Sequence, residues 1–582
     1  MKKFRYTLNL SHIGKYYPNR WDIMAGALVF TLILLLSWGS TQMATPYQLG
    51  EAIPISLSIY ELPEYALRTV IRIALALCLS VIFTFTIGTL AAKSRAAERL
   101  IIPLIDVLQS VPILGFLPII FPLFVAVFKG NLLGPECAAI ILIFTSQVWN
   151  MTLGFYQTLK TVPEELKEAT RVLGLSSWQR FWRLEVPFSL PGLLWNTMLS
   201  LSASWFYVVA AESISISNQV VNLPGMGSYI QLAIHARDVQ AIFYAIITMF
   251  LVILIYDQLI FRPLVDWAMK FNIDTSPGEY SGEKPWVSRF MQHTRLLRYV
   301  SLFFSRFTDF WINTLNRKRQ VTLTEISSTK QKAMLFIYYG WQIVAYGAIL
   351  LGVYLLFTFI LKSLSLQDIY QTLQLGLITA TRVFILIVIA SLIWVPIGVW
   401  IGLNPNTRRI AQPIAQFLAA FPANCFYPIA VLAIVRYQLN PVIWLTPLMI
   451  LGTQWYILFN VIAGTSSIPK ELHQAVGSLG VSKGLWWRRF MLPGIFPYLI
   501  TGAITAAGGA WNASIIVEYI SWGDVTLNAT GLGAYIKEHT IQGDFPRIAL
   551  GVSMMCFYVI LINRFVWQPL YHLAEKRYQI EL

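Results

Sequence analysis

Two polar stretches of this chain share one design and stand 306 residues apart. The first runs from Pro163 to Pro187 and the second from Pro469 to Pro493, and each lies between long apolar runs. Each begins with a helix-forming segment, which Gly174 or Gly480 ends, because glycine adopts the left-handed conformation after a helix without penalty. An aromatic-rich segment then leads into the next apolar run. The pattern predicts two helix–turn–helix hairpins at the ends of apolar spans.

The rest of the chain repeats with nearly the same spacing. An offset of 306 aligns matching residues after position 136, and an offset of 310 aligns them before position 130, so the two copies differ in length by four residues. The aligned pairs are Trp149 with Trp455, Trp205 with Trp511, Glu212 with Glu518, Arg72 with Arg382 and Pro112 with Pro422. Self-similarity at a fixed spacing indicates an internal duplication.

Composition excludes a soluble globular protein. Apolar residues make up 56% of the chain and charged residues only 12%, whereas soluble domains carry about a quarter charged residues. The net charge of +15 does not indicate nucleic-acid binding, because the basic residues lie between the apolar spans, where the positive-inside rule places them. The four cysteines are isolated and show no metal-ligand spacing, so we expect no metal site.

The apolar runs predict an all-α membrane protein with about twelve transmembrane helices in two parallel six-helix repeats. Residues 1–262 form the first repeat, 263–334 a basic cytoplasmic linker and 335–582 the second repeat. The predicted spans are 22–41, 66–92, 108–128, 134–157, 188–212 and 240–261, and then 335–361, 375–402, 414–435, 441–463, 494–520 and 547–567.

The positive charges orient this topology. Segments that it places inside carry 34 of the 43 Lys and Arg residues, and segments that it places outside carry 5. The sequence therefore predicts that both termini and both polar hairpins are cytoplasmic.

The hairpins resemble the signature loop of permease subunits of ABC-type importers, which reads Glu-Ala-Ala, three residues, Gly, nine residues, Ile-x-Leu-Pro. The first copy has Glu168-Ala169-Thr170, Gly174 and Val186-Pro187, and the second has Gln474-Ala475-Val476, Gly480 and Leu492-Pro493. The nitrate, sulfonate, taurine and bicarbonate permeases have an Ala-Glu followed downstream by Gly-Leu-Gly. Two stretches here are similar: Ala211-Glu212 with Gly225-Met226-Gly227, and Val517-Glu518 with Gly531-Leu532-Gly533. The resemblance implies the type I importer permease fold and a small anion such as nitrate, sulfonate, taurine or bicarbonate as the solute, with an organic nitrogen compound as the alternative.

The resemblance also implies partners. Each hairpin would be a coupling helix that docks on one of two ATPase subunits in the cytoplasm, and these subunits would use ATP-Mg. A periplasmic or lipid-anchored solute-binding protein would deliver the solute, and the permease would lie in the inner membrane. The chain itself has no Gly-x-x-x-x-Gly-Lys-Ser/Thr loop, so we expect no catalysis and no bound cofactor. The implied coupling residues are Glu164, Glu165, Glu168, Ala169, Leu173, Gly174, Glu471, Gln474, Ala475, Leu479 and Gly480.

Charged residues at the span ends are candidates for a gate. Glu212 and Glu518 end equivalent spans, and an acid in a membrane span is a functional hypothesis. We favour a gate or structural pair over solute contact, because a carboxylate repels an anion. The alternative is an acid at the outer interface that pairs with an arginine or caps the next turn. Arg72 and Arg382 predict either a cationic vestibule for an oxyanion or, as the alternative, snorkelling at the interface.

Proline-broken third spans are candidates for lining the pathway. Pro112 and Pro422 free backbone groups, which a membrane tolerates only beside protein or water. The polar residues near them are Gln109, Ser110, Gln416 and Asn424. A kink that serves packing alone is the equal alternative.

Two other classes of function fit less of the sequence. A twelve-span secondary transporter of the major-facilitator type also has two parallel halves, but it has no use for two matched coupling loops. A membrane enzyme would need a catalytic motif, and the chain has no His-Glu-x-x-His and no Gly-x-Ser-x-Gly.

Overall fold

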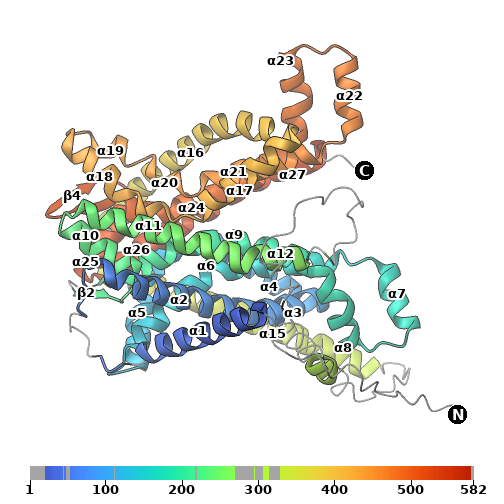
Figure 1. Ribbon diagram of the computed structural model, residues 1–582, viewed down its shortest axis with the longest axis horizontal. Coiled ribbons are helices and arrows are strands. Elements are labelled where there is room, and N and C mark those ends of the chain that lie inside the picture. The colour runs from blue at the N-terminus through green and yellow to red at the C-terminus, as the bar shows by residue number, and fades with distance from the viewer. Residues whose placement is uncertain are drawn as a thin grey trace. The chain divides into compact units, whose positions relative to one another are not determined.

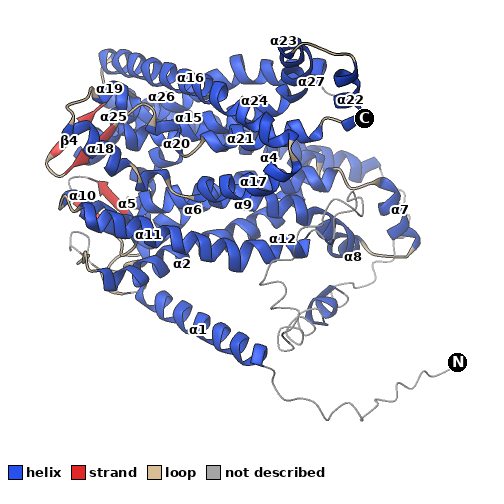
Figure 2. Cartoon of the chain, turned by 45° about the horizontal axis from the view of Figure 1, so that its top comes forward, coloured by secondary structure: helices blue, strands red, loops and turns tan. Residues whose placement is uncertain are grey.

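The computed structural model describes residues 20–43, 45–47, 53–110, 112–216, 219–268, 270, 294, 306–312 and 328–578. Helices make up nearly all of this part of the chain (Figure 2). The basic tail before residue 20 and most of the linker lie outside the described residues.

The first repeat is a series of apolar helices that two short polar helices interrupt. Its elements are α1 (Arg20–Gln42), η2 (Ile59–Glu61), α2 (Leu62–Phe83), η3 (Thr84–Gly88), α3 (Thr89–Lys93), α4 (Arg95–Ser110), α5 (Ile113–Val127), α6 (Leu133–Lys160), α7 (Glu164–Val172), α8 (Ser177–Arg180), η4 (Phe181–Glu185), α9 (Val186–Glu212), β1 (Ser213–Ile216), β2 (Gln219–Asn222), α10 (Met226–His235), α11 (Val239–Tyr256), η5 (Asp257–Phe261) and α12 (Arg262–Ala268).

The second repeat follows the same order with a more broken middle. Its elements are α15 (Ser328–Ser363), α16 (Leu366–Leu403), α17 (Pro405–Ala420), η7 (Ala423–Cys425), α18 (Tyr427–Arg436), α19 (Pro441–Trp444), α20 (Leu448–Leu451), α21 (Gln454–Ser467), α22 (Lys470–Ser478), α23 (Lys483–Trp486), η8 (Trp487–Met491), α24 (Leu492–Val517), β3 (Tyr519–Trp522), β4 (Val525–Asn528), α25 (Leu532–Gln542), α26 (Phe545–Ile562), η9 (Asn563–Trp567) and α27 (Gln568–Tyr578).

The duplication extends to irregular features. The antiparallel pair β1–β2 begins at Ser213↔Asn222, and the pair β3–β4 begins 306 residues later at Tyr519↔Asn528. The π-helical turns η4 and η5 recur at the same offset as η8 and η9. A π-helical turn inserts one residue into a helix and is rare, so its recurrence at equivalent positions is a property of the repeat.

Among the described residues, eight helices are long and apolar enough to cross a membrane, and the number rises to ten if two bent pairs each count as one span. The bends are 69° between Pro405–Ala420 and Ala423–Arg436 and 45° between Pro441–Leu451 and Gln454–Ser467. Ile113–Val127 and Gly347–Ser363 are shorter apolar helices at two further predicted spans. The described residues thus support an all-α membrane protein, but they do not establish the predicted count of twelve.

The chain packs as two compact units that cut across the repeats. One contains Met1–Thr41, Thr161–Leu194 and Tyr256–Leu323, and the other contains Gln42–Lys160, Trp195–Ile255 and Thr324–Leu582. In the first unit, Arg183 Nη2 lies 3.6 Å from Asp309 Oδ1, and Asp309 belongs to the short helix 306–312. A described part of the linker therefore contacts η4. In the second unit, α22 and α23 stand at one end of α24, and β4 and α25 lie at the other (Figure 1).

Small residues allow a close contact between α16 and α21 in the second unit. Gly398 and Gly402 are four residues apart on α16, the spacing that lets membrane helices approach closely. A Cβ atom on Gly398 would lie 2.7 Å from Val461 Cγ1, and one on Gly402 would lie 2.7 Å from Thr465 Cβ. Both partners belong to α21, so side chains of α21 pack directly against the backbone of α16 at these two glycines.

We predict that Gly398→Leu lowers stability by about 1–3 kcal/mol, because the larger side chain overpacks this contact. The measurement is the melting temperature of the purified protein in detergent. Gly347→Leu is the control, since an added Cβ there meets nothing within 4 Å. Equal melting temperatures for the two variants would contradict the proposed role of this contact.

Candidate functional site

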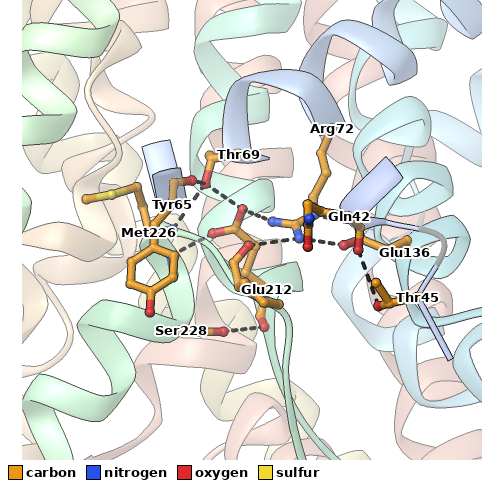
Figure 3. Close-up of polar contacts among 11 residues, drawn as sticks. Gln42, Thr45, Tyr65, Thr69, Arg72, Glu136, Glu212, Met226 and Ser228 are labelled. Carbon is orange, nitrogen blue, oxygen red and sulfur yellow. Dashed lines mark hydrogen bonds and ion pairs between the residues drawn. The ribbon is translucent and has the colours of Figure 1, made fainter. Parts of the chain in front are cut away.

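Buried charges connect three spans of the first repeat. Arg72 on α2 donates from Nη1 to Glu212 Oε1 at 2.6 Å, and from Nε and Nη2 to the two Glu136 oxygens at 2.6 and 2.7 Å (Figure 3). All three side chains are at most 1% exposed. Arg72 Nη2 also donates to the carbonyl of Pro224 at 2.9 Å. The guanidinium therefore uses its donors within the protein, as burial of a charge requires.

The Glu212 carboxylate also holds the start of α10. Glu212 Oε2 accepts from the backbone N–H of Gly227 at 2.6 Å, and Oε1 accepts from Thr69 Oγ1 at 2.6 Å. The Thr69 hydroxyl in turn accepts from the N–H of Met226 at 3.1 Å. Negative charge is favourable at a helix N-terminus. Gly225 is required because a Cβ atom there would overlap the Glu212 carboxylate.

The second repeat builds a similar but smaller network. Arg382 Nη1 donates to Glu518 Oε1 at 3.0 Å, Thr379 Oγ1 donates to the same oxygen at 2.9 Å, and Glu518 Oε2 accepts from Gly533 N at 2.7 Å. The positions equivalent to Glu136 are occupied by Val442 or Thr446, depending on the offset. Arg72 therefore pairs with two carboxylates and Arg382 with one.

The structure brings the predicted acids and arginines together within each repeat. The contacts of Glu212 and Glu518 include both features of the alternative reading, an arginine partner and a cap on the next turn. In this conformation neither arginine forms an open vestibule, and the gate role stays a prediction. Sequence reasoning missed Glu136 and Thr69. Glu136 is the one acid in its predicted span, and an acid within a span is by itself a candidate for function, so this residue could have been found.

The breaks in the third spans are stabilised by the opposite repeat. After Pro112, the N–H of Ile113 donates to Asn512 Oδ1 of α24 at 2.6 Å. Beyond Pro422, Asn424 Nδ2 donates to the carbonyl of Phe206 on α9 at 3.1 Å. Phe206 and Asn512 are equivalent residues, 306 positions apart. The two breaks thus meet the fifth spans in a pseudo-twofold manner.

A cavity of about 400 Å³ lies where these elements meet, and both repeats line it. Gln109 is among its lining residues, whereas Gln416 and Asn424 are not. Gln416 Nε2 lies 3.8 Å from Met198 Sδ, and the Ser110 side chain is outside the described residues. Among the described residues, no Asp, Glu, Lys, Arg or His lines this cavity.

The predicted hairpins form as α7–α8 and α22–α23. Gly174 and Gly480 follow the first helices with φ of +67° and +60°, as the sequence predicts. The predicted coupling residues are exposed in both hairpins. Leu173 and Leu479, at equivalent positions, are 74% and 78% exposed.

The sequence matches the family of binding-protein-dependent transport system inner membrane components twice, over residues 84–262 and 394–577. These matches cover more than half of the chain. The chain belongs to this family. A fused pair of such domains agrees with the duplication described above.

Named relatives of this family of inner membrane components are similar to part of the chain. The bicarbonate transport system permease protein CmpB of Synechococcus elongatus is 29% identical over 31% of this chain and 61% of its own length. The nitrate import permease protein NrtB of Synechocystis is 25% identical over 32% and 64%. The taurine transport system permease protein TauC of Escherichia coli is 27% identical over 32% and 62%. The chain thus spans about three-fifths of the length of these relatives.

We predict that Arg72→Met destabilises this membrane component more than Arg382→Met. The first change leaves two buried carboxylates without their cation, and removal of one partner from a buried pair costs about 3–5 kcal/mol. The second leaves only Glu518. Melting temperatures in detergent should show a clearly larger fall for Arg72→Met. A larger fall for Arg382→Met would contradict the unequal charge balance of the two networks.

A pH dependence is expected in the second hairpin alone. The His473 ring packs edge-on against Phe490 with centroids 5.1 Å apart, and burial lowers the pKa of His473 below its usual 6.5. As pH falls from about 7 through the lowered pKa, the unfolded hairpin takes up the proton first, and the stability from neutral His473 is lost. The equivalent residue of the first hairpin is Lys167.

We predict faster hydrogen exchange in 470–490 at pH 5.5 than at pH 7.5, after correction for intrinsic rates. The peptide 164–185 is the internal control and should show no such change. His473→Leu should remove the difference. Persistence of the pH effect in this variant would show that another group causes it.

Proposed function

We propose that the chain is the membrane permease of an ATP-driven importer and forms the solute pathway between its two repeats. Two cytoplasmic ATPase subunits would use ATP-Mg and dock on the α7–α8 and α22–α23 hairpins. A periplasmic or lipid-anchored binding protein would deliver the solute to the opposite face. The permease would lie in the inner membrane with both termini in the cytoplasm.

The presence of two exposed hairpins carries this proposal. Each has the same helix–glycine–helix geometry and leads through a π-helical turn into an apolar span, Ser177–Glu212 or Lys483–Val517. Because each hairpin continues into its span without a flexible break, a force on the hairpin moves the span as a rigid body. The spans end at Glu212 and Glu518, so the proposed gate networks lie at the far ends of the same helices.

The two docking sites are expected to differ in charge. The first hairpin exposes Glu164, Glu165 and Glu168, whereas the second has Lys470, Glu471 and Gln474 at the equivalent positions. A basic groove on an ATPase subunit would favour the first hairpin electrostatically. The two ATPase contacts would therefore be unequal even with identical subunits.

The relatives that share this family are named for bicarbonate, nitrate and taurine. The resemblance alone predicts a small anion or sulfonate of this kind for the present chain. The match to the family over two segments establishes the family. Identities of 25–29% over a part of each relative do not establish the solute, so the solute has to be argued from the cavity of this chain.

The alternative is a secondary transporter of the major-facilitator type. The experiment that separates the two is co-expression with an ATPase encoded beside this chain, followed by purification and reconstitution in liposomes. An importer requires that the ATPase co-purifies and that uptake depends on ATP. Uptake without an ATPase, driven by an ion gradient, would overturn the proposal.

We predict that Gly174→Val and Gly480→Val each reduce ATP-driven uptake more than ATP hydrolysis. A β-branched residue at positive φ costs about 1–2 kcal/mol, so the hairpin changes shape while the span remains folded. Gly477→Ala is the control, because Gly477 lies inside α22 without a positive φ and has open space around it. Normal uptake by both valine variants would count against the hairpins as coupling elements.

A further inference from the structure

The described wall of the cavity of about 400 Å³ is rich in aromatic side chains and carries no charge. Among the described lining residues are Trp149, Phe206, Tyr207, Tyr427, Tyr456 and Trp511, with no acidic or basic side chain. The two arginines singled out in the spans, Arg72 and Arg382, do not line the cavity and are held by carboxylates. Aromatic faces bind planar rings and apolar surfaces well.

The chemistry of the wall disfavours a bare inorganic anion. An ion that enters a site lined by neutral groups, without a counter-charge, loses hydration that those groups replace only in part. Nitrate and bicarbonate are also small, and they would contact only a fraction of a cavity of about 400 Å³. Pockets of this size usually enclose an organic molecule.

Equivalent positions of the two repeats present different groups to the cavity. Asn150 corresponds to Tyr456, Phe206 to Asn512, and Gln109 to Ala419, and all six line the cavity. In each pair, one repeat offers an amide where the other offers a ring or a methyl group. A permease made of two identical chains would have equal residues here. The duplication has therefore produced a cavity suited to a solute with unlike ends.

Some of these polar groups have no hydrogen-bond partner in the part of the chain that the structure describes. Asn512 is committed, because it accepts from Ile113 N and donates to the Gly508 carbonyl at 3.1 Å. The described residues provide no hydrogen bond to the Asn150 amide or to the hydroxyls of Tyr207 and Tyr456. These three groups can therefore donate to and accept from a bound molecule.

We propose that the cavity binds an uncharged, planar solute with a ring and a hydrogen-bonding edge, of the class of neutral heteroaromatic compounds. The ring would stack among the aromatic walls, and its polar edge would meet Asn150, Tyr207 and Tyr456. The statement that this molecule is the transported solute rests on the proposed import role. Binding itself can be tested on this chain alone.

The test is a thermal-shift titration of the full-length protein in lipid nanodiscs at neutral pH and constant ionic strength. The neutral probes are nicotinamide, cytosine and adenine, and the comparison probes are sodium nitrate, sodium bicarbonate and taurine. We expect at least one neutral ring compound to raise the melting temperature saturably. Tyr456→Phe removes one hydroxyl, and we expect it to weaken that binding about three- to tenfold.

Tyr437→Phe is the matched control, since Tyr437 is 68% exposed and does not line the cavity. It should leave the titration unchanged. The proposal is overturned if no neutral ring compound gives a saturable shift, if the shift is insensitive to both Tyr456→Phe and Asn150→Ala, or if only the comparison probes bind.

The two proposals fail separately. If an ATPase drives uptake of nitrate, bicarbonate or taurine, the import role stands and the solute class is wrong. If neutral rings bind at Tyr456 and no ATPase associates, the cavity assignment stands and the import role is wrong.

Discussion

The need to satisfy every buried charge and backbone group inside the protein governs this structure. A lipid interior offers no hydrogen bonds, so a span can break within it only where a protein group or water takes over. Each fifth span ends in a glutamate that does this for two neighbours, an arginine of the second span and the first turn of α10 or α25. These contacts fix the relative positions of three elements in each repeat. The breaks of the third spans depend on the same rule across the repeats, through Asn512 and Asn424.

The same constraint explains why the cavity lies where it does. A proline-broken helix exposes donors and acceptors, and the partner repeat uses some of them to join the two halves. The remaining space is bounded by aromatic rings and amides from both copies. Phe206 and Asn512 each contact the opposite repeat and also line the cavity. The difference between these equivalent residues therefore affects both the contact between the repeats and the wall of the cavity. Fusion of the repeats in one chain makes such one-sided changes possible.

Much of the architecture follows from patterns in the sequence. The offsets of 306 and 310 placed the hairpins, the equivalent arginines and glutamates, and the breaks at Pro112 and Pro422 correctly, because duplication and glycine or proline geometry are local signals. The pairing of Arg72 with Glu212 could not be derived, since it joins residues 140 positions apart through the packing of separate helices. Glu136 has no copy in the second repeat, so a search by duplication passed over it. The β-hairpins after the fifth spans were missed for a related reason: four-residue strands carry too short an alternation to be recognised.

The π-helical turns have a consequence for how the hairpins are aimed. One extra residue per turn rotates everything that precedes it by roughly 100° about the helix axis. The turn Trp487–Met491 therefore determines how far α22–α23 is rotated about the axis of α24, whichever face α24 presents to its neighbours. Phe181–Glu185 is the equivalent turn of the first repeat. Loss of a single residue from either turn would restore a regular helix and rotate the attached hairpin about the helix axis. The number of residues in each five-residue π-helical turn thus determines the direction in which the hairpin points. The residues that the hairpin exposes are a separate property of the sequence.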